Sequence, residues 1–155
     1  MRLYRIAKST YAQDLSGTGA GLYGGRWNPK GLNMVYSAGS IALASLEYLA
    51  HNFHLIPTLE SSLSIIEIPD DAPIIELQKE LLPKGWDTKL GSYHNTQNLG
   101  KEFLSEGKAY VLKVPSVIVP MEYNYLLNPL HSVHKHAKII EMIIPFKLDS
   151  RLVGQ

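Results

Sequence analysis

One arginine in a glycine-rich setting is the residue best suited to bind an anionic group. Arg26 lies in segment 24–29, Gly-Gly-Arg-Trp-Asn-Pro, where small neighbours leave its side chain accessible. Its planar guanidinium donates two parallel, charge-assisted hydrogen bonds, which suits a phosphate or pyrophosphate. A carboxylate, Glu47, falls in a mostly apolar segment, where burial is unfavourable unless the group has a partner or a function. Together these residues predict a site for an anionic, sugar-containing ligand.

A helix predicted over Ile41–Phe53 positions Glu47. Ser40 is a suitable N-cap for this helix because its hydroxyl can accept a hydrogen bond from a free backbone N–H group. At 3.6 residues per turn, Glu47 shares a face with Leu43, Ala44, His51 and His54. That face either is the solvent-exposed strip of the helix or lines a cleft. Spacing alone favours the exposed strip, since charged residues usually lie at the surface.

Tyr36 and Ser116 complete the set of candidate site residues. Tyr36 belongs to a predicted strand, Asn33–Ser37, that ends just before the helix. Ser116 lies between Pro115 and Pro120, an arrangement that suits an edge strand. A lone serine indicates no particular chemistry. The sequence contains no G-x-S-x-G nucleophile elbow, which argues against a serine hydrolase.

Two further patterns have weaker interpretations. Residues 19–24 match the dinucleotide fingerprint G-x-G-x-x-G, but that site needs a preceding strand and a helix that opens within it. The glycines and proline that follow predict that no helix begins there, so a Rossmann site is not favoured. His131, His134 and His136 cluster near the C-terminus. Without H-E-x-x-H or an acidic partner at ligand spacing, a polar helix face is favoured over a metal site.

Composition narrows the class of protein. The chain has 155 residues, a formal net charge of +1 and no cysteine, so we predict a single domain over residues 1–155 without disulfides. The apolar stretches are far shorter than a membrane span, and residues 1–6 lack the apolar run of a secretory signal. A cytoplasmic protein is therefore expected. No dense Lys/Arg run occurs, so direct nucleic-acid binding is not expected.

Short strands dominate the predicted elements. Strands are expected at Leu3–Ile6, Asn33–Ser37, Ser62–Ile68, Ala109–Val114, Val117–Val119, Asn124–Leu127 and Lys138–Leu148. Helices are expected at Ile41–Phe53, Gln97–Glu106 and Pro129–Ala137, with a short element in Pro73–Leu82 and an irregular loop at Ser9–Lys30. Clean βαβ alternation is missing, which favours a mixed α+β domain. Ile65, Ile66, Ile74 and Ile75 fit either the core or an interface.

The order of these motifs resembles the RES domain family, named for its Arg, Glu and Ser. The resemblance covers essentially the whole chain and rests on Leu3-Tyr4-Arg5-Ile6, Gly25-Arg26-Trp27-Asn28, Tyr36-Ser37, Ser45-Leu46-Glu47, Val114-Pro115-Ser116, residues 124–129 and residues 146–152. One departure is His131-Ser132, where the family more often has His-Pro. The resemblance implies an ADP-ribosyltransferase-like split β core of short strands with flanking helices.

The same resemblance implies a function and a partner. It implies a bacterial toxin of a type II toxin–antitoxin pair that degrades NAD⁺ as its substrate and requires no metal or other cofactor. The partner would be an Xre-type antitoxin that blocks the active site and carries the DNA-binding function. The site residues implied by the resemblance are Arg26, Tyr36, Glu47 and Ser116.

For NAD⁺ we expect cleavage of the nicotinamide N-glycosidic bond through an oxocarbenium-like transition state, stabilised by the Glu47 carboxylate. Arg26 would bind the pyrophosphate or a ribose hydroxyl, and Tyr36 would stack on nicotinamide or close the pocket. Ser116 would hydrogen-bond the ribose or the carboxamide. Water, phosphate and a protein side chain all remain possible acceptors of ADP-ribose. A non-catalytic nucleotide-binding module is the rival from another class.

Overall fold

The structure, a computed structural model, describes residues 1–52, 60–88 and 93–152. Within these residues seven strands form one sheet in the order β4-β5-β6-β2-β1-β3-β7. Neighbouring strands are antiparallel except β4 and β5, which are parallel. The strands are β1 Arg2–Lys8, β2 Val35–Ala38, β3 Ser61–Glu67, β4 Ile74–Glu76, β5 Val111–Pro115, β6 Tyr123–Leu127 and β7 Lys138–Ile143.

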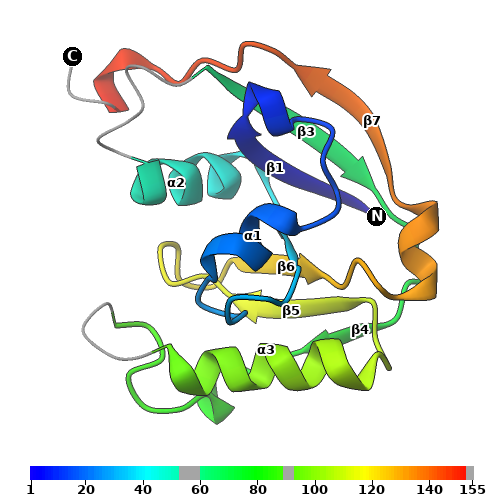
Figure 1. The fold of residues 1–155 in the computed structure, drawn as a ribbon. Helices are drawn as coiled ribbons and strands as arrows, with labels where there is room; N and C mark the ends of the chain where they lie inside the picture. Colours follow the sequence, from blue (N-terminus) through cyan, green and yellow to red (C-terminus); the bar gives the residue numbers. More distant parts are fainter. Residues whose placement is uncertain (53–59, 89–92, 153–155) are drawn as a thin grey trace.

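The sheet is split between β1 and β2. These two strands are in register only where Tyr4 lies opposite Ala38, whereas β1 pairs with β3 along its full length. Figure 1 shows the two halves, with β1, β3 and β7 in the upper part of the view and β4, β5 and β6 in the lower part. The expected α+β class with a split β core is confirmed. A split of this kind opens space for a ligand between the halves.

Three helices flank the sheet: α1 Thr18–Tyr23, α2 Ile41–Asn52 and α3 His94–Glu106. Ser40 caps α2 as predicted, because its Oγ accepts a hydrogen bond from the backbone N–H of Leu43 at 3.1 Å. Phe53, the expected end of α2, lies outside the described residues. In Figure 1, α2 lies beside β1 and α3 runs under the lower half of the sheet. The 3₁₀ turns are η1 Ser9–Tyr11, η3 Lys79–Leu81, η4 Ser132–His136 and η5 Ser150–Leu152.

Strand β5, in the lower half of the sheet, packs against core residues on both faces. Along β5, Val111 packs into one core cluster with Leu3, while Leu112 and Val114 pack into another with Phe103 of α3. Alternation of this kind follows from the two-residue period of a strand, since successive side chains point to opposite faces. A third, smaller cluster joins α2 to the end of β2. The first cluster spans both halves of the sheet, because it also holds Ile66 of β3 and Leu127 of β6.

The isoleucines that the sequence left between core and interface divide clearly. Ile66 is fully buried, whereas Ile74 and Ile75 of the edge strand β4 are 42% and 37% exposed.

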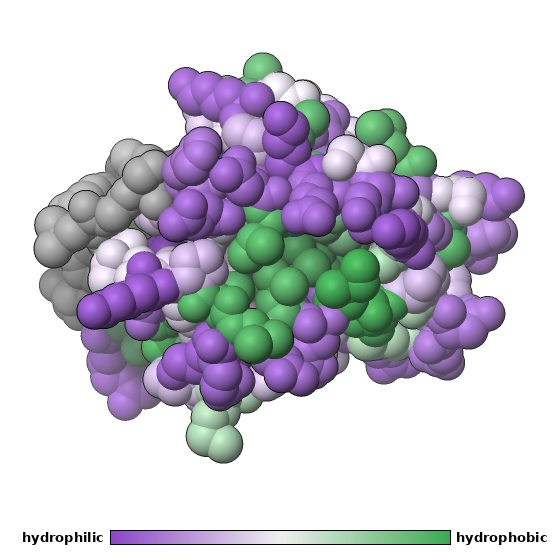
Figure 2. Space-filling model, turned by 90° about the horizontal axis from the view of Figure 1, so that it is seen from below, coloured by the Kyte–Doolittle hydropathy of each residue, from purple (hydrophilic) through white to green (hydrophobic). Residues whose placement is uncertain are grey.

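Figure 2 shows the side on which α3 lies, where hydrophobic surface gathers in the middle of the face and hydrophilic residues surround it. None of the described helices is long and apolar enough to cross a lipid bilayer.

The prediction that Ser9–Lys30 is wholly irregular was wrong. Helix α1 contains two of the three glycines of the fingerprint, ends at Tyr23 and has the third, Gly24, as its C-cap. Polar groups outside the helix bind it and the segment before it: Asn28 Nδ2 donates to the carbonyl oxygen of Ala20 in α1 at 2.8 Å, and Asn33 Nδ2 donates to that of Ser16, ahead of α1, at 3.2 Å. Local propensity disfavours a helix with two glycines, so tertiary hydrogen bonds decide its formation.

Three predictions near the C-terminus also need correction. Val117–Val119 is a turn, not a strand, because Ser116 Oγ accepts hydrogen bonds from the N–H groups of Ile118 and Val119. The helix expected at Pro129–Ala137 is only the 3₁₀ turn η4. Strand β7 ends at Ile143, and the peptide bond that follows, between Ile144 and Pro145, is cis. Proline cannot donate to a strand ladder, which explains the early end of β7.

Candidate active site

A cavity of about 630 Å³ lies where the two halves of the sheet meet. The single register pair between β1 and β2, Tyr4 and Ala38, lines its wall. The rest of the lining comes from β1, β2, β6, the loop around Arg26, helices α1 and α2, the start of α3 and the β5–β6 connection. Among the residues that line the cavity are Arg5, Arg26, Tyr36, Glu47, His51, Tyr93 and Asn124. Three of the four predicted site residues, Arg26, Tyr36 and Glu47, therefore share one cavity.

Glu47 lies on the cavity face of α2 and is held by two side chains from the lower half-sheet. Ser116 Oγ donates to Glu47 Oε1 at 3.0 Å, and Asn124 Nδ2 donates to the same oxygen at 2.6 Å. Ala44 and His51, which share a helix face with Glu47 in the sequence analysis, line the same cavity. This face is thus the wall of a cleft, not a solvent-exposed strip.

Ser116 is brought to Glu47 but lies behind it. Its side chain is 5% exposed, and it is not among the residues that line the cavity. Its position follows from the turn after β5, which its own hydroxyl stabilises. Ser116 therefore binds the Glu47 carboxylate, and Glu47 in turn lines the cavity.

Arg26 is fixed in place by the segment that leads into α3. Its Nη1 donates to the carbonyl oxygen of Trp86, and its guanidinium stacks on the ring of Tyr93 at 4.6 Å from the ring centre. The backbone of the same loop is bound by α3, since Thr96 Oγ1 donates to the carbonyl oxygen of Arg26 at 2.6 Å. A guanidinium stacked on an aromatic ring keeps other N–H donors available for an anion.

Tyr36 uses its hydroxyl to shape the Arg26 loop. The hydroxyl donates to Asn28 Oδ1 at 2.7 Å and accepts from the backbone N–H of Trp27 at 3.1 Å. Burial raises the pKa of Tyr36 well above its ordinary value, so the phenol stays protonated. A Cβ added at Gly25 would lie 2.5 Å from this hydroxyl, which explains the glycine next to Arg26.

Arg5 and Asn124 line the cavity, although the sequence analysis did not name them as site residues. Arg5, on β1, supplies a second guanidinium, and its Nη1 donates to the carbonyl oxygen of Tyr11 at 3.0 Å. Burial lowers the pKa of Arg5, and the nearby Asp14 carboxylate opposes that shift. Asn124, on β6, binds Glu47. An arginine in a short, mostly apolar strand was a signal in the sequence that could have indicated Arg5. No local feature of the sequence indicates Asn124.

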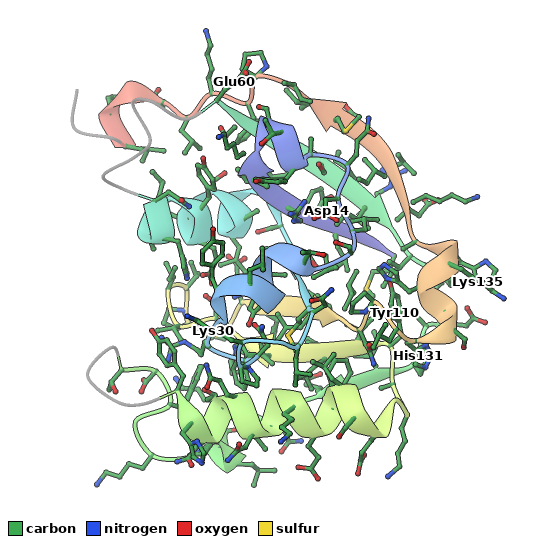
Figure 3. All side chains as sticks on the ribbon, in the orientation of Figure 1. Asp14, Lys30, Glu60, Tyr110, His131 and Lys135 are labelled. Carbon is green, nitrogen blue, oxygen red and sulfur yellow. The ribbon has the colours of Figure 1, made fainter. Side chains whose placement is uncertain are left out.

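The three C-terminal histidines do not form a metal site. His131 and His134 pack against the ring of Tyr110, with ring centres 5.7 and 5.6 Å apart, while His136 is exposed. Figure 3 shows Tyr110 and His131 beside one another near η4. Within residues 1–52, 60–88 and 93–152, no three His, Cys, Asp or Glu side chains are grouped closely enough to hold a metal ion.

Comparison with known proteins identifies the class. The RES domain family matches residues 2–149. A protein from Photorhabdus laumondii named "Toxin Res" is 39% identical over 155 residues, covering 99% of this chain and 97% of the relative. A "Toxin Res" from Pseudomonas putida is 41% identical over 155 residues, covering 98% and 99%. A protein from Sphingobium named "Prs ADP-ribosylating toxin" is 40% identical over 140 residues, covering 88% and 86%.

A solved structure shares the fold. The Mycobacterium tuberculosis MbcT–MbcA toxin–antitoxin complex contains a chain that aligns with a TM-score of 0.78, covering 99% of this chain and 89% of that one, at 17% identity. The match of the family model to residues 2–149 defines the class. The chain belongs to the RES domain family, and its full-length relatives place it among the RES toxins.

Proposed function

We propose that this toxin cleaves the N-glycosidic bond between nicotinamide and ribose in NAD⁺. The observation that carries the proposal is the Glu47 carboxylate held at the wall of a cavity that also contains two arginines. A fixed carboxylate stabilises an oxocarbenium ion, and guanidinium groups bind a pyrophosphate. The name of the Sphingobium relative supports the same bond as the reactive one, because ADP-ribosylation also begins with loss of nicotinamide.

In the proposed reaction the bond from ribose C1′ to the pyridinium nitrogen breaks, and its electron pair goes to that nitrogen. Nicotinamide then leaves as a neutral molecule, so no strong general acid is needed. Positive charge develops on C1′ and the ring oxygen, where the free carboxylate oxygen of Glu47 stabilises it. Water adds to C1′ and gives up one proton, so the products are nicotinamide, ADP-ribose and H⁺.

The remaining cavity residues bind and orient the dinucleotide. Arg26 and Arg5 come from different elements, the 24–29 loop and β1, and both line the cavity. We assign the pyrophosphate to Arg26, because its stacking on Tyr93 presets the direction of its free donors. The Tyr36 ring lines the cavity next to Arg26 and provides a surface for nicotinamide. No metal or further cofactor takes part.

A second candidate function is transfer of ADP-ribose to a protein. The name of the Sphingobium relative, an ADP-ribosylating toxin, favours this candidate. The same cavity would serve, because only the group that attacks C1′ differs. Phosphate in place of water is a third outcome of the same cleavage. A module that binds nucleotide without turnover remains the non-catalytic rival.

We further propose an antitoxin as the partner, of the Xre type, that covers the cavity and supplies DNA binding. The toxin–antitoxin complex that shares this fold supports a protein partner. On this chain Leu22 and Tyr23, at the end of α1 and close to Arg26 in sequence, are 64% and 78% exposed. The near-neutral charge agrees with a protein that leaves DNA binding to its partner. We also propose that the protein is a single domain and acts in the cytoplasm.

The test is NAD⁺ consumption by the purified protein, with and without phosphate, followed by chromatography of the products. Release of nicotinamide with free ADP-ribose supports hydrolysis, and a phosphorylated ADP-ribose supports phosphorolysis. Radiolabelled NAD⁺ added with a cell lysate would instead mark a protein if transfer is the activity. NAD⁺ binding without nicotinamide release in any of these assays would contradict the proposal and leave the non-catalytic module.

A further inference from the structure

The Glu47 carboxylate is bound on one side only. Both side-chain donors that reach it, Ser116 Oγ and Asn124 Nδ2, bind Oε1, at 3.0 and 2.6 Å. Among the described residues no hydrogen bond to Oε2 is found, and Glu47 lines the cavity. Within this part of the chain the two oxygens of the carboxylate therefore differ, since Oε1 accepts two hydrogen bonds and Oε2 accepts none.

The directions of these hydrogen bonds are determined by the neighbouring groups. The Ser116 hydroxyl has one proton and two lone pairs. Its oxygen already accepts from the N–H groups of Ile118 and Val119, at 3.0 and 3.1 Å, so its single proton goes to Glu47. The amide of Asn124 likewise presents its NH₂ group, because a carboxylate oxygen only accepts. Oε1 is thus held by two donors that have no alternative arrangement.

The two donors come from the two ends of one connection. Ser116 follows β5 directly and Asn124 lies in β6, opposite Val114 of β5 and Ala38 of β2. Asn124 is therefore positioned by strands on both sides, which fixes its amide more firmly than a loop would. Helix α2 brings Glu47 to these donors from the opposite side of the split.

We propose that Asn124 is a positioning residue which, together with Ser116, fixes Glu47 so that Oε2 alone meets the substrate. This proposal rests on the proposed NAD⁺ cleavage and assigns a role to a residue outside the Arg–Glu–Ser set. It also changes the role expected for Ser116. The hydroxyl of Ser116 is fully used within the protein, so it orients Glu47 and does not bind the ribose or the carboxamide.

A positioning role predicts a specific kinetic signature. Without Asn124, Glu47 is still present, but its carboxylate is free to rotate away from the reactive carbon. Misplacement of a catalytic group by about 1 Å can lower the rate by about a hundredfold. We therefore expect Asn124→Ala to lower kcat by about tenfold to a hundredfold. KM should stay within about twofold, because the arginines that bind the pyrophosphate are unchanged.

The experiment compares Asn124→Ala, Glu47→Gln and the double variant by nicotinamide release. If Asn124 acts through Glu47, the substitution at position 124 has no further effect once Glu47 is Gln. Asn124→Asp, which places an acceptor against Oε1, should be at least as damaging as the alanine variant. Asn98→Asp on α3, an exposed asparagine outside the cavity, is the matched control and should retain wild-type activity.

A crystal structure of Asn124→Ala supplies a readout that does not depend on activity. The proposal expects the Glu47 carboxylate in a different or mixed orientation. An unchanged orientation of the Glu47 carboxylate would overturn the proposal. It would also be overturned if Asn124→Ala lowered the activity of the Glu47→Gln variant as much as it lowers that of the wild type. Failure of NAD⁺ cleavage by the wild-type protein would contradict the proposed function instead, and the carboxylate orientation would still decide the positioning role.

Discussion

Two partly buried hydrogen-bond networks in this protein have similar chemistry but different roles. In one, Glu47 accepts from Ser116 and Asn124 on a single oxygen. In the other, the Tyr110 hydroxyl is 2.8 Å from His134 Nδ1, and His134 Nε2 is 2.9 Å from the carbonyl oxygen of Leu15. Because a carbonyl oxygen only accepts, Nε2 carries the proton and the Tyr110 hydroxyl donates to Nδ1. Each network joins segments that are far apart in sequence.

The difference lies in what each network leaves unbound. Both ring nitrogens of His134 have partners, so the Tyr110–His134–Leu15 network is closed and stabilises the fold. The Glu47 network occupies one carboxylate oxygen, the other accepts no hydrogen bond from the described residues, and Glu47 itself lines the cavity. A polar group with spare bonding capacity at a cavity is a candidate for chemistry, whereas a saturated group is structural.

The largest effect is expected from removing the negative charge of the Glu47 carboxylate. Glu47→Gln keeps the size of the side chain but loses the negative charge that stabilises the oxocarbenium ion. Loss of one preorganised electrostatic group lowers the rate by about a hundredfold or more. Nicotinamide release from NAD⁺ measures this, and thermal unfolding controls for folding. Wild-type turnover by the variant would show that the open carboxylate has no catalytic role.

A somewhat smaller effect is expected from Arg26. Replacing Arg26 with Lys keeps a positive charge but loses the planar fork and the stacking on Tyr93. Hydrogen bonds to charged groups contribute about 1.5–3 kcal/mol, so kcat/KM should fall by about tenfold to a hundredfold. Steady-state kinetics should show most of this loss in KM. A loss confined to kcat would move Arg26 from substrate binding to the reacting bond.

Disrupting the Tyr110–His134–Leu15 network should lower the stability of the protein and leave its activity unchanged. Tyr110→Phe removes the hydroxyl that donates to His134 and leaves one ring nitrogen without its partner. An unsatisfied buried acceptor destabilises a protein by about 1–3 kcal/mol. Urea unfolding should report this loss, while NAD⁺ cleavage by the folded variant should match the wild type. A strong drop in cleavage with unchanged stability would mean that this network also serves the site.

The smallest effect is a pH dependence of stability that depends on His134. Burial lowers the pKa of His134 below its ordinary value of 6.5, and the hydrogen bond to Leu15 opposes the shift. Below about pH 6.5 the unfolded chain binds the proton more readily than the folded one, so stability falls as the pH decreases. For one proton the slope is at most about 1.4 kcal/mol per pH unit. The free energy of unfolding of His134→Gln, measured from pH 7 to 5, should depend less on pH than that of the wild type. An equal slope in the two proteins would contradict the prediction.

Local sequence signals predicted much of the fold correctly. The cap at Ser40 and the apolar residues after it indicated α2, and alternation of β-branched residues indicated β3. The errors fell where distant groups decide local structure. Helix α1 is bound by the side chain of Asn28, and the turn after Ser116 is bound by that serine's own hydroxyl. Propensity does not include such bonds.

The sequence by itself determined which residues can do the chemistry: an accessible arginine beside glycines, and a carboxylate on an apolar helix that required a partner. Only the tertiary structure decided how they are arranged. Ser116 and Asn124 are 69 and 77 residues from Glu47 along the chain, and the pairing of β2, β5 and β6 brings both to one carboxylate oxygen. The open oxygen depends on contacts between the two halves of the sheet, which no local pattern encodes.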